Sequence, residues 1–89
     1  MTILGTHVAA ELRLTRRFQK SFEKLDKVLR EKVSLAVGEL ADNPRLGKPL
    51  KGPLEDEWSL RVGDYRVLYS IDRNIVWVET VRHRREAYR

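Results

Sequence analysis

Arginines in the second half of the chain are the side chains best suited to chemistry. Four of them lie in residues 82–89 beside a single glutamate, so this segment has a net charge of +3 (four less one). A guanidinium presents paired donors that match phosphate oxygens, and a tyrosine ring can stack on a base. The segment therefore indicates a nucleic-acid ligand, with a solvated basic terminus as the alternative. Its candidate residues are Arg82, His83, Arg84, Arg85 and Tyr88.

Two further arginines lie in residues 58–69, WSLRVGDYRVLY, which predict a β-hairpin. Apolar and polar residues alternate on both sides of Gly63-Asp64, and glycine tolerates the positive φ of a tight turn. A two-residue loop would place Arg61 directly opposite Arg66. Like charges opposed in this way destabilise a sheet by about 0.2–1 kcal/mol, which favours an anionic ligand on this face. The other face would be apolar, through the pairs Trp58–Tyr69, Leu60–Val67 and Val62–Tyr65.

The segments that must position these arginines are predicted from periodicity and capping residues. Alternation over residues 8–14 predicts a first strand. Thr15 and Asp26 are suitable N-caps for two successive helices, each with an apolar face. The second helix should end at Asn43-Pro44, because proline cannot continue a helix. Residues 15–42 therefore predict a helical hairpin.

The remainder completes an α+β fold of one domain over residues 1–89. Residues 43–56 contain all three prolines and predict a loop with little regular structure. After the hairpin, a turn at Arg73-Asn74 leads to a last strand over residues 75–82. The predicted order is β-α-α-β-β-β, with the helical hairpin packed on one face of a mostly antiparallel sheet.

Composition limits the possible partners and compartment. The 89 residues carry a net charge of +5 and a pI near 9.9, which favours an acidic partner such as nucleic acid or an acidic protein. There are no cysteines, a composition that fits a reducing cytoplasm. No apolar run approaches the ~20 residues that span a bilayer, and the first residues lack the pattern of a signal peptide. We therefore expect a cytoplasmic protein without a membrane partner.

Two stretches together resemble a known toxin family. NPRLGKPLKGPLEDEWSLRVGDYRVLYSID and the later RHRREAYR are similar to the RelE/ParE superfamily, the stable halves of type II toxin–antitoxin pairs. The resemblance covers residues 15–89. It implies a β-α-α-β-β-β fold and, for the RelE branch, a ribosome-dependent mRNA endoribonuclease without metal or cofactor. In that reaction the 2′-OH attacks the adjacent phosphorus while the message lies in the ribosomal A site.

The resemblance also assigns roles to residues. Arg66 and Arg84 match the family's phosphate-binding arginines, and Tyr88 matches a terminal tyrosine that stacks on a base or assists proton transfer. His83 is the side chain of this segment whose type most often transfers protons in enzymes. The chain departs from the best-studied branch because EDEWSLR contains no lysine, where that branch has two. His83 is then the proposed proton-transfer group. Four residues are expected to bind the substrate: Lys51, Arg61, Arg82 and Arg85.

Two other functions stay open. One is a ParE-type toxin that inhibits DNA gyrase without hydrolysis, and the other is a catalytically weak relative that binds its antitoxin. In each case the expected partner is a cognate acidic antitoxin, in a toxin–antitoxin heterotetramer at rest. A regular ladder after Arg73-Asn74 would place Trp77 and Val81 beside Leu68 on the arginine face. Such an apolar patch predicts a partner site for an acidic antitoxin segment.

Overall fold

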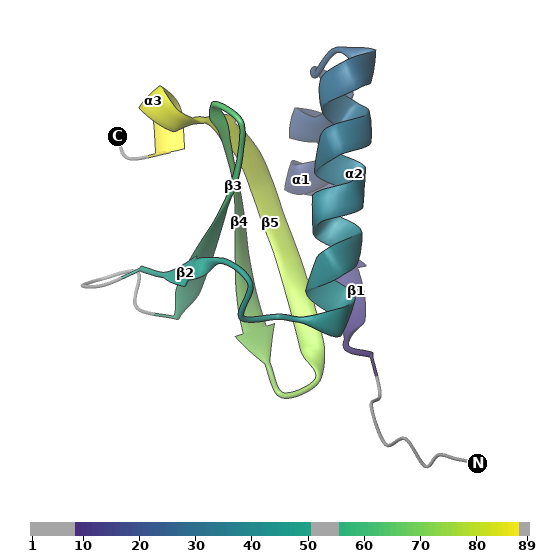
Figure 1. The fold of residues 1–89 in the computed structure, drawn as a ribbon, viewed down its shortest axis with the longest axis vertical. Helices are drawn as coiled ribbons and strands as arrows, with labels where there is room; N and C mark the ends of the chain where they lie inside the picture. The colour runs from purple at the N-terminus through teal and green to yellow at the C-terminus, as the bar shows by residue number, and fades with distance from the viewer. Residues whose placement is uncertain (1–8, 51–55, 88–89) are drawn as a thin grey trace.

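The computed structural model describes residues 9–50 and 56–87. A pair of helices stands along one face of a twisted sheet, and the last short helix lies on the other side (Figure 1). This arrangement confirms the predicted α+β class and the helical hairpin on one face. The elements are β1 (Glu11–Leu14), α1 (Arg16–Glu23), α2 (Lys27–Asp42), β2 (Lys48–Pro49), β3 (Glu57–Val62), β4 (Tyr65–Asp72), β5 (Ile75–His83) and α3 (Arg84–Ala87).

The strands form a mixed sheet in the order β1-β5-β4-β3-β2. β1 pairs with β5 in parallel, whereas the three other pairings are antiparallel. β1 is shorter than predicted: it begins at Glu11, and the backbone N–H of Ala10 donates to the carbonyl of Ala41 instead of joining a ladder. Residue 8 lies outside the described residues.

Both predicted helix caps are confirmed. The hydroxyl of Thr15 accepts a hydrogen bond from the N–H of Phe18 at 3.0 Å, and the Asp26 carboxylate accepts one from the N–H of Leu29 at 2.9 Å. Each cap satisfies a donor that the first turn of a helix leaves free. The second helix ends at Asp42, as the Asn43-Pro44 pair predicted.

The core lies between the helices and the sheet, and its largest fully buried side chain is Tyr69. The phenol hydroxyl donates to the carbonyl of Pro44 at 2.7 Å and accepts from the N–H of Gly47 at 3.0 Å. Gly47 must be glycine here, since a Cβ would lie 2.6 Å from the Ser59 carbonyl oxygen and 2.8 Å from the Tyr69 hydroxyl. Burial raises the pKa of Tyr69, and the hydrogen bond from Gly47 opposes part of that rise.

The segment after α2 contains more structure than predicted. Lys48 and Pro49 form a two-residue strand that pairs with Ser59 and Trp58 on β3. Proline is tolerated at this position because β2 is the edge strand of the sheet. The prediction of little regular structure over residues 43–56 is therefore wrong at β2, while residues 51–55 lie outside the described part.

The hairpin register is confirmed pair by pair: Trp58–Tyr69, Leu60–Val67, Arg61–Arg66 and Val62–Tyr65 face each other across β3 and β4. Gly63 has a φ of 61°, the left-handed value that a tight hairpin turn requires.

The second hairpin departs from the prediction at a β-bulge between Leu68 and Tyr69, where Glu79 is the extra residue on β5. Before the bulge Tyr69 pairs with Val78, and after it Leu68 pairs with Thr80. A one-residue change of register reverses which face a side chain occupies. Val81 is consequently buried in the core and does not join the arginine face, so that part of the prediction is wrong.

Candidate functional site

Three arginines lie side by side across the sheet, near the turn between β3 and β4. Arg61 on β3 is paired with Arg66 on β4, and Arg66 is paired in turn with Arg82 on β5. Residues directly opposed across a ladder point to the same face, and neighbouring strands are about 4.8 Å apart. We call these three residues the arginine row. The bulge creates it, because a regular ladder would have placed Val81 opposite Arg66.

The arginine row lies on the face of the sheet that α1 and α2 leave uncovered. The residues that alternate with it on β4, Val67 and Tyr69, are fully buried in the core on the other face. Arg66 and Arg82 are half-buried, and Arg61 is exposed with its Nε donating to the carbonyl of Gly63 at 3.1 Å. Three fixed positive charges in one row present a surface that favours a phosphate.

Arg84 and Arg85 open the short helix α3, directly after β5. The backbone N–H of Arg84 donates to the carbonyl of Asp64 at 2.7 Å, which fastens the start of α3 to the β3–β4 turn. Both side chains are exposed. This bond brings the predicted phosphate-binding residue Arg84 to the same end of the sheet as the arginine row.

His83 is separated from the arginine row by the alternation of β5. It pairs with Tyr65, whose ring it meets edge to face with 5.3 Å between the ring centres, and both line a cleft beside α1. Its Nδ1 accepts a hydrogen bond from the N–H of Arg85 at 3.3 Å. In this arrangement the ring proton of a neutral His83 lies on Nε2. Two other predicted site residues, Lys51 and Tyr88, lie outside the described residues.

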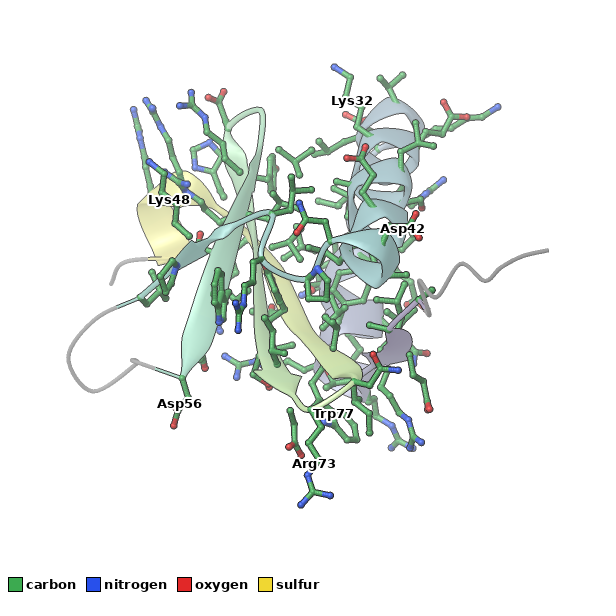
Figure 2. All side chains as sticks on the ribbon, turned by 60° about the horizontal axis from the view of Figure 1, so that its bottom comes forward. Lys32, Asp42, Lys48, Asp56, Arg73 and Trp77 are labelled. Atoms are coloured by element: carbon green, nitrogen blue, oxygen red, sulfur yellow. The ribbon has the colours of Figure 1, made fainter. Side chains whose placement is uncertain are left out.

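The sequence analysis missed two polar residues next to the arginine row. Lys48 pairs with Ser59, which lies two residues before Arg61 on β3, so both lie on the same face as Arg61. Ser59 Oγ is buried and, among the described residues, has no hydrogen-bond partner. Figure 2 shows Lys48 well away from Arg73, which lies at the opposite end of the sheet. Only the strand pairing of β2 could have indicated Lys48, and two residues are too short a strand to predict.

Farther along the same face, Trp77 is half-buried and pairs with Ser70. The guanidinium of Arg13 lies over its ring, 5.6 Å from the centre. The ring is therefore not covered by the helices. The predicted patch keeps Trp77 and Leu68 and loses Val81.

Comparison with known proteins gives the family. Residues 12–88 match the family described as "ParE toxin of type II toxin-antitoxin system, parDE". The chain belongs to the RelE/ParE toxin superfamily. Two Mycobacterium tuberculosis toxins are similar in sequence. Toxin RelE is 45% identical over 67 residues, which are 74% of this chain and 66% of that toxin. Toxin RelG is 38% identical over 82 residues, which are 88% of this chain and 94% of RelG.

Solved structures of RelE toxins share the fold. The M. tuberculosis RelBE2 toxin–antitoxin complex contains a chain that matches with a TM-score of 0.75 and 36% identity, over 85% of this chain and 92% of that one. Isolated E. coli RelE matches with a TM-score of 0.71 and 28% identity, over 90% and 92%. The chain is thus a type II toxin–antitoxin toxin of the RelE family. In the described residues no helix is long and apolar enough to cross a membrane.

Proposed function

We propose that this chain is an mRNA endoribonuclease that acts in the ribosomal A site and cleaves RNA through its own 2′-OH. The observation that carries the proposal is the arginine row, with Arg84 fastened beside it. Phosphoryl chemistry needs preorganised cations where negative charge increases in the transition state. The arginine row supplies such cations on strands whose other face is packed in the core, which supports the backbone that carries them.

In the proposed reaction the 2′-oxygen forms a bond to phosphorus as the bond from phosphorus to the 5′-oxygen breaks. The 2′-OH loses a proton, and the leaving 5′-oxygen gains one. The row stabilises the negative charge that gathers on the non-bridging oxygens. Arginine keeps its proton, so this row cannot act as the base.

The proton transfers are assigned to Tyr88 and His83 as separate hypotheses. His83 lies on the cleft side of β5 and would reach the substrate only around the end of that strand. Tyr88→Phe should keep most of the activity if the ring only stacks on a base, and should lose it if the hydroxyl transfers a proton. His83→Gln tests the other assignment, because glutamine cannot accept and release a proton, so cleavage should be lost if His83 transfers one.

The test is a reconstituted translation reaction in which primer extension maps the 3′ ends of the message. The parent should cut within codons in the A site. Arg66→Ala should slow cleavage by about 10²–10³-fold, the usual effect of removing one preorganised donor, and thermal unfolding of the variant checks that it is folded. Arg73→Asn is the matched control, because it removes an arginine from the far end of the sheet (Figure 2). Asparagine tolerates the positive φ of 57° at that position. Equal cleavage by Arg66→Ala and the parent would refute the nuclease hypothesis.

The description of the matching family, a ParE toxin, favours one competing function. A ParE-type toxin would inhibit DNA gyrase and cut nothing. A supercoiling assay run beside the translation reaction separates the two: gyrase inhibition with intact message would establish the ParE-type function, and cleavage with unaffected gyrase would exclude it.

The proposed resting state is a heterotetramer with an acidic antitoxin in the cytoplasm. RelB antitoxin–RelE toxin complexes are known for relatives, including the M. tuberculosis complex. The proposed contact is the open face, where Trp77 and Leu68 lie in the same sheet face as the arginine row. Trp77→Lys should weaken antitoxin binding measured by calorimetry. If the affinity for the antitoxin is unchanged, the antitoxin binds another surface of the toxin.

A further inference from the structure

We propose that the cleft between α1 and β5 is a second phosphate-binding subsite, which holds the RNA strand next to the nucleotide at the arginine row. The cleft has a volume of about 480 Å³. This inference extends the proposed function and rests on it for the identity of the RNA. It gives a role to basic residues of α1 that the reaction at the arginine row does not use.

The cleft exists because β5 is longer than β1. β1 pairs only with residues 75–78 of β5, so from Glu79 onward that side of β5 has no neighbouring strand among the described residues. The free edge is met instead by Ser21 of α1, whose Oγ accepts from the N–H of Val81 at 3.2 Å and from the hydroxyl of Thr80 at 3.4 Å. These bonds fix the distance between the helix and the strand and form a polar floor.

The walls of the cleft are basic. Arg17, Lys20 and Lys24 lie three and four residues apart, the spacing that puts side chains on one face of a helix. Arg82 and His83 form the opposite wall. None of the described residues that line the cleft is acidic. The three exposed cations of α1 repel each other and attract an anion.

The chemistry of the lining favours a nucleic-acid strand over an acidic peptide. Arginine and lysine bind carboxylates as well as phosphates, so the charges alone do not decide between an acidic peptide and a nucleic acid. Two further features do. The rings of Tyr65 and His83 lie at the wall, where bases can stack. Arg82 belongs both to the cleft and to the arginine row. An RNA strand that leaves the row at Arg82 therefore reaches the cleft by passing around the free edge of β5.

The test measures binding of a short single-stranded RNA by fluorescence anisotropy over a range of salt concentrations. The RNA carries 2′-O-methyl groups, so 2′-OH attack cannot consume it. The variant is Lys20→Ala/Lys24→Ala, whose side chains are exposed and whose loss should leave the fold intact. The charge-matched control is Lys27→Ala/Lys32→Ala on α2, because neither lysine lines the cleft. Figure 2 shows Lys32 on α2.

The cleft variant should bind the RNA about three- to tenfold more weakly. The slope of log affinity against log salt should become shallower by about 1.4, that is, about 0.7 for each of two lost phosphate contacts on a single strand. The control should match the parent. Parent-like affinity and slope in the cleft variant, or no binding of RNA by the parent at low salt, would overturn the proposal. So would a poly-glutamate peptide that binds at least as tightly as the RNA and is lost in the same variant.

This readout is independent of cleavage. If the parent cuts no message but the cleft variant loses RNA affinity as expected, the nuclease function fails and the subsite stands. If the parent cuts message and the cleft variant binds RNA normally, the nuclease function stands and the subsite fails.

Discussion

On β4, Val67 and Tyr69 face the helices and are completely buried, whereas Arg66 and Leu68, the alternating residues, face the uncovered side of the sheet. On the helix side, the apolar side chains pack within the chain and the Tyr69 hydroxyl makes two hydrogen bonds within it. The open side gathers like charges opposite one another in its ladder. Residues that follow one another along a strand can therefore be constrained by opposite requirements: one face is built for stability and the other for a ligand.

The largest effect on stability should come from the helix side. Leu40 of α2 is fully buried, so Leu40→Ala should lower the free energy of unfolding by about 2–5 kcal/mol. Leu35 lies on the same helix but is 72% exposed, and Leu35→Ala should change that free energy by no more than about 0.5 kcal/mol. Urea denaturation measures both. Similar costs for the two variants would mean that the outer face of α2 is also covered in solution.

Tyr69→Phe isolates the polar part of the helix side. It leaves the ring but removes the hydroxyl that bonds to Pro44 and Gly47, and should cost about 1–3 kcal/mol of unfolding free energy. Tyr65→Phe is the control, because no hydrogen bond of the Tyr65 hydroxyl is found among the described residues. Equal stability of the two variants at neutral pH would contradict the structural role of the Tyr69 hydroxyl.

The raised pKa of Tyr69 predicts a dependence on alkaline pH. Burial makes the folded state hold the phenol proton more strongly than the unfolded state, whose pKa is near the ordinary value of 10.0. The folded state therefore binds more protons once the pH exceeds about 10, and its stability falls as the pH rises further. Below about pH 10 the protonated Tyr69 contributes its full share to the free energy of unfolding. Denaturation curves of the parent between about pH 9 and 11 should show a decline that Tyr69→Phe reduces, and identical pH profiles would refute this assignment.

A smaller effect on stability is expected at Thr15, which connects the start of α1 to the bulge residue Glu79. The hydroxyl of Thr15 both caps α1 and donates to the carbonyl of Glu79 at 2.9 Å. Thr15→Ala should lower the unfolding free energy by about 0.5–2 kcal/mol, the usual cost of losing an N-cap. Thr15→Ser keeps the hydroxyl and should stay close to the parent. Thermal unfolding of the two variants compares them directly, and equal loss would show that the methyl group rather than the hydroxyl matters.

The smallest effect has the opposite sign and belongs to the open side. Arg61→Thr removes one of two arginines that oppose each other across the ladder, so it should raise the unfolding free energy by about 0.2–1 kcal/mol. The same variant should weaken RNA binding. Greater stability together with weaker binding would show directly that the row is maintained for a ligand, and lower stability would mean that the row supports the fold.

Local signals predicted the elements and failed where pairing between distant segments decides the outcome. Thr15 and Asp26 could be recognised as caps because a cap requires only the next three residues. The register of the first hairpin followed from a turn of two residues. In contrast, β2 is a strand only because β3 lies beside it, and the bulge residue Glu79 contacts Thr15, which is 64 residues away in the sequence.

The same limit applies to the candidate site. Arg61 and Arg66 were predicted to face each other because both belong to one hairpin. Arg82 was expected to bind substrate, but its place opposite Arg66 required the bulge, which nothing in the alternation of residues 75–82 indicates. The basic face of α1 is visible in the spacing of Arg17, Lys20 and Lys24. That this basic face lines a cleft follows only from the packing of α1 against the free edge of β5, which the sequence does not indicate.

The bulge also affects how related chains should be aligned. Glu79 is an extra residue, so a chain that lacks it could join Val78 to Thr80 in a regular ladder and still place an arginine opposite Arg66. Loss of one residue at this point would thus shorten β5 without dispersing the row. A one-residue gap at position 79 between two such toxins would then be no sign that the site has been lost, whereas a gap in the middle of β4 would be.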